Sequence, residues 1–489
     1  MLDSNNVIIK YLVELGYNPD TEYYAYIDSW KKWYQNNVPK FHEYFDSLGE
    51  KRKLYKLGMA KRICEDWSSI LYTEKDSIVC QNEENNKYLE KQLKKLKFND
   101  AIPHNIETAF WSGTAGTILR VKNAKIEEEK IVADENTYYE LVNLNASQII
   151  PLVIEDGKIK DVAFVSETKI ESERAYYIEI HELEQDGYVI KNRYINEKGK
   201  EKENSGVVKE YRTHSNIPLF SLLMPRIVNN IEDNNGLGIS IFANAIDQLK
   251  ACDITYNNFV MDYFLGGKKI FYNKKLVRYE TITYTDAEGK QVTREVAIYP
   301  DDIMKQQWKI VGDPDATAND EPLITEYNPE LREEENEDGV NFALNSLAFK
   351  CGMGKSYYKL DNTGSVVTAT QAILDNKDLV ANAKKHRSAV NEYSVGIAKA
   401  ILLLGKILFN EQNIDEEDEI NLVDKDGFMI SEEDLKEQYM QEISAGLRSK
   451  TSYIMKFYGK TEEEAKKELR LIDEEERSNN LYLGNGEEM

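Results

Sequence analysis

One stretch near the middle of the chain decides how the rest is organised. It reads Ser240-Ile-Phe-Ala-Asn-Ala-Ile-Asp-Gln-Leu-Lys-Ala-Cys-Asp-Ile-Thr-Tyr-Asn-Asn-Phe-Val-Met-Asp-Tyr-Phe-Leu265, and it lies between Gly236 and Gly238 on one side and Gly266-Gly267 on the other. Its apolar residues recur at helical spacing, Ser240 is of a type that caps helix N-termini, and paired glycines end helices. About 25 residues at a rise of about 1.5 Å each predict a helix of roughly 37 Å. A helix of that length suits a spanning strut better than a small globular domain.

The residues after this helix predict a β-rich insertion followed by a second helix that runs back toward the start of the first. Residues Lys268–Pro322 are β-rich, and Glu288-Gly289 gives a hairpin signal between Thr281–Tyr284 and Val292–Ile298. The acidic run that begins at Glu333 then opens a second helix, which ends near Phe349. We therefore expect a long helix, a β insertion and a returning helix.

The residues before the strut predict helices followed by strands. Apolar residues at three- and four-residue steps between Leu54 and Leu71 predict an amphipathic helix, and further helices are expected up to Gly113. From Thr117 onward short β-rich runs alternate with polar residues, and Asp156-Gly157 and Asp186-Gly187 are typical hairpin turns. This half of the chain is therefore predicted to be α+β.

The residues after the return helix predict further helices. No proline follows Pro329, and proline is the residue that breaks helix interiors. A very long helix is predicted from Thr368 to Phe409, and Ser431-x-x-Asp434 and Thr461-x-x-Glu464 resemble capping boxes. The whole chain is thus predicted to be an α+β protein that is mainly helical.

Composition excludes several classes of protein. The chain has 489 residues with 62 Lys and Arg against 86 Asp and Glu, a formal net charge of −24. A generic nucleic-acid binder carries a positive excess, so that class is excluded, whereas a protein that lets DNA pass without gripping it is not. Hydrophobic residues make up 41% of the chain, which is typical of a folded protein rather than a disordered one.

The cysteines, the N-terminus and the hydropathy pattern predict an intracellular protein that is not inserted in a membrane. Met1–Asn6 lacks the basic and then apolar pattern of a signal peptide, and Ile397–Phe409 falls short of the ~20 apolar residues that span a bilayer. The histidines show no ligand spacing, so no metal site is expected. The cysteines form no Cys-x-x-Cys pair and predict inert thiols in a reducing compartment; they are Cys64, Cys80, Cys252 and Cys351.

Short motifs give no support for catalysis. Gly354-Lys355-Ser356 imitates the end of a phosphate-binding P-loop, but Phe349 stands where that motif needs its first glycine. Tyr357-Tyr358-Lys359 follows and predicts an extended segment, whereas a P-loop opens a helix there. A mobile glycine-containing loop is the better interpretation. Since no nucleophile motif or catalytic carboxylate pair is visible, we expect a protein that is not an enzyme and uses no cofactor.

Aromatic residues in the first helices allow two interpretations. Trp67, Phe110 and Trp111 could form a ligand-binding patch. They lie on apolar helix faces, however, and core packing is the usual role of aromatic residues in that position. The core interpretation is therefore favoured.

Groups of residues taken in chain order resemble one family. They are Leu57–Trp67 with Ile70–Glu74 and Ala109–Arg120; Gly236–Phe242 with Asp247 and Asp253; Tyr327–Arg332 with Gly352-Met353-Gly354 and Thr368–Gln371; and Ala445–Lys450 with Gly459–Ala465 and Glu468-Leu469. In this order and spacing the chain resembles portal proteins of tailed bacteriophages, of the siphophage type common in phages of Gram-positive bacteria. The resemblance covers nearly the whole chain. One departure is Gln371, where the family often has glutamate.

The resemblance implies a fold with named regions that assembles as a ring, usually of twelve subunits. By this analogy the regions are a wing over 1–235, a stem helix over 236–267, a clip over 268–322, a stem return helix over 323–349, a tunnel loop over 350–367, a long wing helix over 368–414 and a helical crown over 415–489.

The resemblance also implies a function. The ring would lie at one vertex of the capsid and form a channel through which double-stranded DNA is packaged and later ejected. Implied partners are further copies of the chain, the DNA itself without regard to sequence, the terminase large subunit, a head-completion or adaptor protein, and the scaffolding and major capsid proteins. The chain would be assembled in the host bacterial cytoplasm and located in the virion, with no membrane partner.

Candidate functional residues follow from the predicted loop. The DNA-facing residues would be Lys355, Ser356, Tyr357, Tyr358 and Lys359. Glycines populate backbone conformations closed to other residues, so the hinges of the loop would be Gly352, Gly354 and Gly364. DNA contact by a few lysines would be directed at phosphates and independent of base sequence. No catalytic residue and no metal ligand is predicted.

Two rival functions remain beside the channel. One is a terminase-like DNA-packaging ATPase, which only Gly354-Lys355-Ser356 supports. The other is a different ring-forming head–tail connector. Such connectors are usually much shorter than 489 residues.

Overall fold

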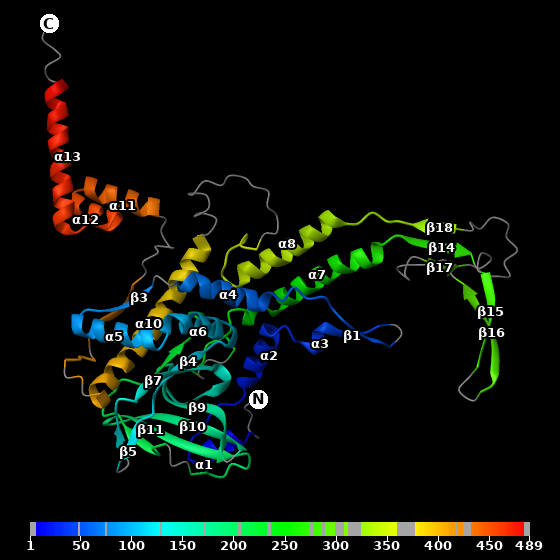
Figure 1. The fold of residues 1–489 in the computed structure, drawn as a ribbon, viewed down its shortest axis with the longest axis horizontal. Coiled ribbons are helices and arrows are strands. Elements are labelled where there is room, and N and C mark those ends of the chain that lie inside the picture. The colour runs from blue at the N-terminus through cyan, green and yellow to red at the C-terminus, as the bar shows by residue number, and fades with distance from the viewer. Residues whose placement is uncertain are drawn as a thin grey trace, which may run out of the picture.

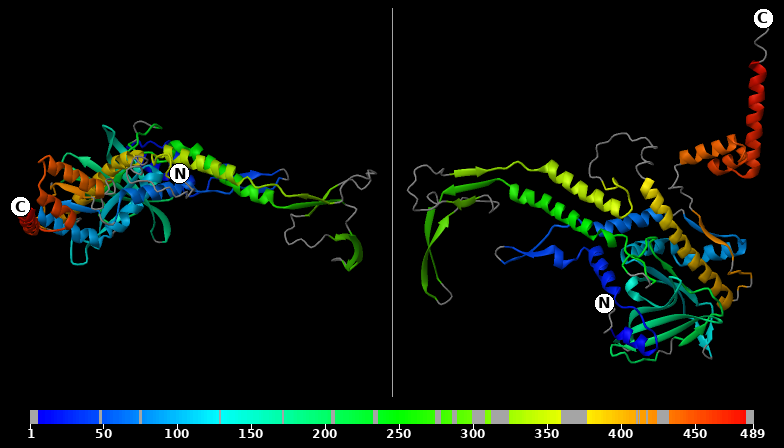
Figure 2. Two further views of the ribbon diagram at one scale, coloured as in Figure 1. Left: turned by 90° about the horizontal axis from the view of Figure 1, so that it is seen from above. Right: turned by 180° about the vertical axis from the view of Figure 1, so that it is seen from behind.

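A long pair of helices extends from a body of packed helices and sheets. The computed structural model describes residues 6–46, 49–73, 76–127, 130–170, 172–203, 207–231, 236–273, 278–285, 289–298, 308–311, 324–358, 377–409, 411, 413–416, 418–423 and 432–483. Figure 1 shows α7 (Ile246–Gly266) and α8 (Glu333–Lys350) running side by side from the body to a small β region, with α11 (Glu432–Ser444), α12 (Lys450–Tyr458) and α13 (Glu462–Leu483) on the other side of the body. Figure 2 shows the same elongated outline from behind and from above.

The N-terminal helices form one part of the body, as the sequence predicts. They are α1 (Val7–Glu14), α2 (Tyr24–Tyr34), α3 (Pro39–His42), α4 (Met59–Leu71), α5 (Glu83–Lys95) and α6 (Phe98–Ser112). Helices α4 and α6 pack on each other, and Trp67, Phe110 and Trp111 are all buried in the core. The core interpretation of these aromatic residues is confirmed.

Antiparallel sheets form the rest of the body. One has the order β13 (Phe220–Leu223), β4 (Ala115–Lys122), β7 (Tyr138–Asn145). Another has the order β12 (Glu210–Arg212), β11 (Gly187–Asn196), β10 (Glu173–Glu184), β9 (Lys158–Ile170), β8 (Ile149–Glu155). Shorter elements are the hairpins β1 (Glu43–Phe45) with β2 (Lys51–Lys53) and β5 (Lys125–Glu127) with β6 (Lys130–Val132), and the turn of 3-10 helix η1 (Ala146–Gln148).

The predicted hairpin turns are found, one of them shifted. Asp156 and Gly157 both have positive φ angles, of 51° and 73°, and join the paired residues Glu155 and Lys158. In the other hairpin Gly187 already belongs to β11 and pairs with Glu184. The turn there is Gln185-Asp186, one residue earlier than the sequence suggests.

The strut predicted from Ser240 begins six residues later than expected. Helix α7 spans Ile246–Gly266 and follows the 3-10 turn η2 (Ala243–Ala245). The backbone before it is bonded elsewhere, because Ile241 N donates to Phe110 O and the Ser240 hydroxyl donates to the same oxygen. Gly238 also approaches Gly113 so closely that a Cβ atom on Gly238 would lie 2.4 Å from Gly113 O. These contacts hold the segment against α6 and prevent it from joining the helix.

The chain between α7 and α8 forms a β region, as predicted. Strands β15 (Arg278–Thr285) and β16 (Gln291–Ile298) form the expected hairpin, and a second sheet has the order β17 (Trp308–Val311), β14 (Lys269–Asn273), β18 (Ile324–Tyr327). The returning helix begins at Glu333, as the sequence predicts, and the segment before it is a strand. This strand is β18, which pairs with β14, and α8 (Glu333–Lys350) starts only after Pro329.

The long helix α10 (Lys377–Phe409) crosses the body and is buried along much of its length. The predicted start at Thr368 lies outside the described residues. Strand β19 (Ile420–Val423) follows and pairs with β3 (Ser77–Cys80), more than 300 residues earlier in the chain. This strand was not predicted, because it is stabilised by that distant partner rather than by a local pattern.

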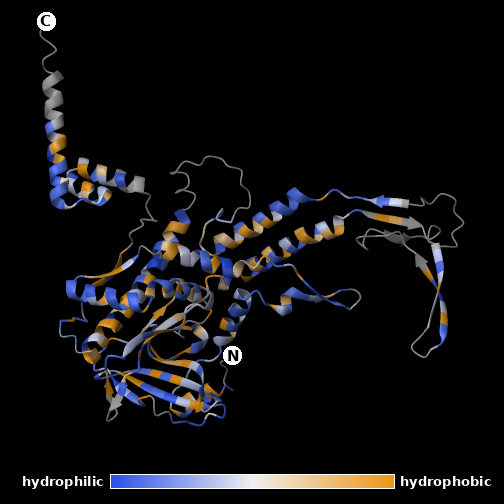
Figure 3. Cartoon of the chain, viewed as in Figure 1, coloured by the Kyte–Doolittle hydropathy of each residue, from blue (hydrophilic) through white to orange (hydrophobic). Residues whose placement is uncertain are grey.

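The C-terminal module consists of α11 (Glu432–Ser444), α12 (Lys450–Tyr458) and α13 (Glu462–Leu483). The capping box at Thr461 is confirmed, since Thr461 N donates to Glu464 and Glu464 N donates to the Thr461 hydroxyl. The one predicted at Ser431 lies outside the described residues. Figure 3 shows apolar residues along α7 up to its end, whereas the start of α8 is hydrophilic.

The cysteines lie in the body and at the base of α7 and α8. Cys64, Cys80, Cys252 and Cys351 are free and buried. Burial raises the pKa of the Cys252 thiol to about 12 and that of Cys80 to about 11. These thiols are therefore poor nucleophiles, in agreement with the sequence.

Candidate functional site

The outer ends of α7 and α8 are joined by polar contacts around Asp262. Its carboxylate accepts hydrogen bonds from Arg332 Nε at 3.1 Å and Nη2 at 2.6 Å, and from Asn336 Nδ2 at 2.7 Å. Arg332 and Asn336 together lower the pKa of Asp262. The contacts fix where α8 begins relative to the end of α7.

The inner end of α7 is anchored to the body by a buried carboxylate. Asp253 accepts hydrogen bonds from Leu57 N at 2.8 Å and Gly58 N at 3.4 Å, and its second oxygen lies 2.9 Å from His42 Nε2. Both side chains of the His42–Asp253 pair are almost fully buried. Buried carboxylates need such partners, so α7 is held in a fixed direction where it leaves the body.

The predicted loop begins with a fixed turn at the end of α8. Met353 N donates to Ala348 O and Gly352 N to Phe349 O, which closes the helix end. Gly352 and Gly354 have positive φ angles of 79° and 88°, the conformation that favours glycine. The backbone of the turn is held from the body, because Trp67 Nε1 donates to Cys351 O and Asn382 Nδ2 donates to Gly352 O.

The predicted DNA-facing residues that the structure describes separate into an exposed pair and a half-buried pair. Lys355 and Ser356 are exposed, whereas Tyr357 and Tyr358 are half-buried. The Tyr358 hydroxyl donates to Asp66 Oδ2 at 2.7 Å, and the two tyrosine rings meet edge to face. Burial raises the pKa of both tyrosines, and for Tyr358 the hydrogen bond to Asp66 adds to this effect. Lys359 and Gly364 lie outside the described residues.

The structure brings Asp66 and Arg62 to this site, which the sequence interpretation missed. Arg62 Nε donates to Asp66 Oδ2 at 3.0 Å, and its Nη2 lies 2.9 Å from Oδ1. Asp66 therefore joins Tyr358 to α4. Two signals could have found it: Asp66 stands beside the buried Trp67, and Arg62 precedes it by four residues, the spacing of helical ion pairs.

The geometry of the turn is not that of a nucleotide site. A P-loop follows a strand, opens a helix and points helix N–H groups at phosphate. Here Gly354-Lys355-Ser356 follows the C-terminal end of α8, where the helix ends in carbonyl groups rather than N–H groups, and residues 355–358 form turns. The packaging-ATPase interpretation therefore loses the one feature that supported it.

Large apolar side chains lie exposed along α7 and α8. Phe342 is 76% exposed and Phe349 is 55% exposed, and their spacing of seven places both on one face of α8. On α7 the side chains of Ile254 and Leu265 are also exposed, Leu265 by 57%. Exposed apolar side chains aligned on a helix are typical of a surface that packs against another molecule.

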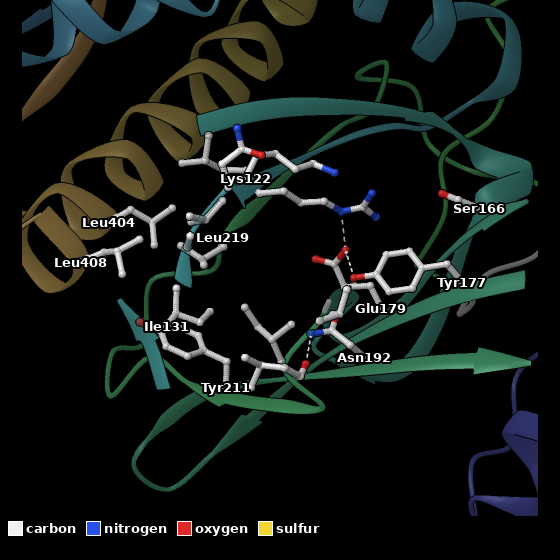
Figure 4. A pocket seen from close by; sticks show the side chains of 18 of the residues that line it. Lys122, Ile131, Ser166, Tyr177, Glu179, Asn192, Tyr211, Leu219, Leu404 and Leu408 are labelled. Atoms are coloured by element: carbon white, nitrogen blue, oxygen red, sulfur yellow. Dashed lines mark hydrogen bonds and ion pairs between the residues drawn. The ribbon is translucent and has the colours of Figure 1, made fainter. Parts of the chain in front are cut away.

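A separate cavity of about 430 Å³ lies between the sheet of the body and α10 (Figure 4). Leu404 and Leu408 line its apolar side, and Tyr177, Glu179 and Asn192 line its polar side. Arg120 Nε donates to Glu179 Oε2 at 2.6 Å, and Tyr177 OH donates to Asn192 Oδ1 at 2.7 Å. These polar groups bond one another, so we interpret the polar side of the cavity as part of the packing of the body.

Burial by itself would raise the pKa of Glu179. The hydrogen bond to His181, at 2.9 Å, and the charge of Arg120 outweigh burial and lower this pKa to about 2. Glu179 is therefore an ionised carboxylate held by two partners in the interior.

Two further findings concern the described residues. Among them, no cluster of His, Cys, Asp and Glu side chains could hold a metal ion. Within the same part of the chain, every helix is too short or too polar to cross a bilayer.

Comparisons with known proteins show a likeness in structure only. No protein-family model matches the chain, and no curated protein matches it. The chain is similar to a chain described as "Neck of native GTA particle computed with C12 symmetry", with 10% identity, 88% of this chain and 92% of that chain covered, and a TM-score of 0.39. It is also similar to one described as "Virion of native gene transfer agent (GTA) particle", with 10% identity, the same coverage of 88% and 92%, and a TM-score of 0.37. At these scores the folds superpose only in part.

Proposed function

We propose that this chain is a portal-type subunit that assembles into a ring around a channel for double-stranded DNA. The ring would lie at one capsid vertex, and twelve copies is the number that the family resemblance implies. The chain would act as a conduit and docking platform without catalysis. DNA would pass in during packaging and out during ejection.

The exposed apolar faces of α7 and α8 carry this proposal. Phe342 and Phe349 lie on α8, and Ile254 and Leu265 on α7, with much of each side chain in solvent. Burying apolar surface yields about 25 cal/mol per Å², so such faces favour association. A face of α7 that meets a face of α8 on the next copy is a heterologous contact, and such contacts give a ring when the rotation from copy to copy closes.

The distribution of charge also supports a conduit. The first turn of α8 carries Glu333, Glu334 and Glu335, all exposed, and the whole chain has a net charge of −24. Acidic walls repel phosphates, which keeps DNA from adhering as it slides. Lys355 on the turn after α8 would supply a contact to phosphate that does not depend on sequence.

The distal β region is suited to docking a partner. In the sheet with the order β17-β14-β18, the outer strands β17 and β18 are edges. Edge strands offer unpaired backbone groups to another chain. We propose this region as the place where the packaging motor, the terminase large subunit, and later a head-completion protein dock in turn. Scaffolding and major capsid proteins would contact the body.

Electron microscopy of the purified full-length protein tests the proposal. Wild-type protein is expected to form closed rings, and the double variant F342E/F349E to remain dispersed but folded by circular dichroism. The matched control is V228E, because Val228 is also highly exposed but lies outside α7 and α8. A wild-type protein that stays monomeric at high concentration and with scaffolding partners would overturn the proposal. Rings formed equally well by F342E/F349E would overturn the assigned contact.

A further inference from the structure

The C-terminal module contains an apolar groove that has no role in the function proposed above. Its volume is about 470 Å³. It is lined from all of α11, α12 and α13 by Met440, Ile443, Ser444, Lys450, Tyr453, Ile454, Tyr458, Lys460, Glu468, Leu469 and Ile472. The residues Met440, Ile443 and Ser444 follow helical spacing, as do Leu469 and Ile472, so whole helix faces converge on the groove. Grooves of this kind bind an amphipathic helix.

The module buries little apolar surface of its own. Among its described hydrophobic side chains, only Ile454 and Ala465 are buried, and neither belongs to the main core of the chain. Met440 and Ile472, which line the groove, are 54% and 41% exposed. A unit with so small a core gains stability from a partner that covers its groove.

Helix α13 itself provides a suitable occupant. Figures 1 and 2 show it continuing well past α11 and α12. At about 1.5 Å per residue, the helix reaches about 16 Å beyond Ile472 at its last residue, Leu483. In sequence this distal part holds the acidic run Glu474-Glu475-Glu476 and the apolar run Leu481-Tyr482-Leu483.

Charge at the groove complements that segment. Lys450, Lys460 and Glu468 line the groove, and because Lys460 pairs with Glu468 at 2.9 Å, Lys450 leaves the lining with a net positive charge. A segment whose sequence has an acidic run and an apolar run therefore matches the net charge and the apolar lining of the groove.

We infer that the groove binds the distal part of α13, residues 473–483, from a second copy of this chain. The contact is heterologous, since the groove of one copy receives the helix end of the next, and it therefore propagates around a ring. The inference rests on the proposed function for its closed geometry. It adds a specific contact between neighbouring C-terminal modules.

Disulfide trapping in the full-length protein tests this contact. In the variant K450C/Y482C, one cysteine lies at the groove and the other about 15 Å beyond Ile472 along α13. Disulfides need Cα atoms within about 7 Å, so the expected product after mild oxidation is a ladder of chains linked to one another. The native cysteines do not compete, because all are buried.

The matched control is K467C/Y482C, because Lys467 is exposed on α13 but does not line the groove. It is expected to give at least tenfold less linked product. Equal linking in the control, or the same ladder from Y482C alone, would mean that the helix ends meet elsewhere and would overturn the inference.

A second pair of variants tests the groove without cysteines. M440E introduces a charge into the groove and is expected to weaken self-association about tenfold. Met455 is 40% exposed but does not line the groove, so M455E is expected to leave association unchanged. Equal association of the two variants would contradict the inference.

Electron microscopy of the same samples separates this inference from the proposed function. Rings without a ladder from K450C/Y482C would overturn the groove contact and leave the proposed ring intact. A ladder without closed rings would support the groove contact and overturn the proposed function. The absence of both would overturn both.

Discussion

The Tyr358 hydroxyl donates a hydrogen bond to Asp66 Oδ2 across 2.7 Å, and this contact joins the turn after α8 to helix α4. Asp66 is held in turn by Arg62, at 3.0 Å from Nε. The start of the predicted loop is therefore tied to the body of the subunit.

Replacing Tyr358 by phenylalanine is expected to release this turn. A hydrogen bond to a charged group contributes about 1.5–3 kcal/mol, so local opening becomes about ten- to a hundredfold more populated. Trypsin cleavage after Lys355 measures this opening. Y357F is the control, because the tyrosine hydroxyl that bonds Asp66 belongs to Tyr358. Equal cleavage of Y357F and Y358F would show that the hydrogen bond does not hold the turn.

Removing the Asp253 carboxylate is expected to destabilise the base of α7. D253A leaves His42 and the amides of Leu57 and Gly58 without their buried acceptor, at a cost of about 3 kcal/mol. D247A is the matched control on the same helix, because the side chain of Asp247 is 86% exposed and pairs with Lys250 at the surface. Chemical denaturation compares the two, and similar losses would contradict an anchoring role for Asp253.

The order of elements could be predicted from the sequence far better than the contacts between them. Periodicity and turn residues predict α7, the β15–β16 hairpin and α8, because these depend on local spacing. The start of α7 was misplaced, because the close approach of Gly238 to Gly113 is a contact across more than 100 residues. Strand β19 was missed for the same reason, as its partner β3 is distant in the chain.

The candidate site shows the same difference between local features, which the sequence predicts, and contacts between distant residues, which it does not. The sequence predicts backbone freedom at Gly352 and Gly354, and both have positive φ angles. Tyr358 was expected to face DNA, yet its hydroxyl bonds a carboxylate of the body. The direction of a side chain depends on the surface that it meets, and Asp66 is nearly 300 residues away in sequence.

His386 is expected to make stability fall as the pH falls from about 6.5 to about 4. Burial, and to a lesser extent Lys385, lowers the pKa of this histidine to about 4. Between the two pKa values the unfolded chain binds a proton that the folded chain does not, so acid favours unfolding by up to about 3 kcal/mol. H386N removes the titration and should flatten this part of the stability profile. An unchanged profile would show that His386 is not the group responsible.

Glu179 is expected to change the stability of the fold at lower pH than His386 does. Because its pKa is lowered to about 2 in the folded chain, its contribution is complete above about 4.5 and is lost as the pH falls toward 2. At pH 7, E179Q leaves the buried Arg120 without a charged partner and should cost about 3 kcal/mol. E167Q is the control, because the side chain of Glu167 is 65% exposed. Equal effects of E179Q and E167Q on thermal unfolding would exclude a buried ion pair of this strength.

Lys355 is expected to contact DNA without contributing to assembly. It is exposed on a turn whose neighbours Gly352 and Tyr358 are held by Asn382 and Asp66. A lysine on such a fixed turn is a point charge for a phosphate that passes by, whatever its base. K355A should therefore leave rings intact in electron micrographs and weaken retention of double-stranded DNA. The slope of log affinity against log salt should become shallower by about 0.9 for each phosphate that the substitution leaves unneutralised.

Further variants of Lys355 separate an effect of its charge from a structural effect on the turn. K355R keeps the positive charge and should restore both retention and the salt slope, whereas K355E should weaken retention further than alanine. Rings that fail to form in K355A would show that the turn is structural and that the site assignment is wrong. A salt slope that is the same in K355A and wild type would mean that the phosphate is bound elsewhere, because removing a lysine that displaces counterions must change that slope.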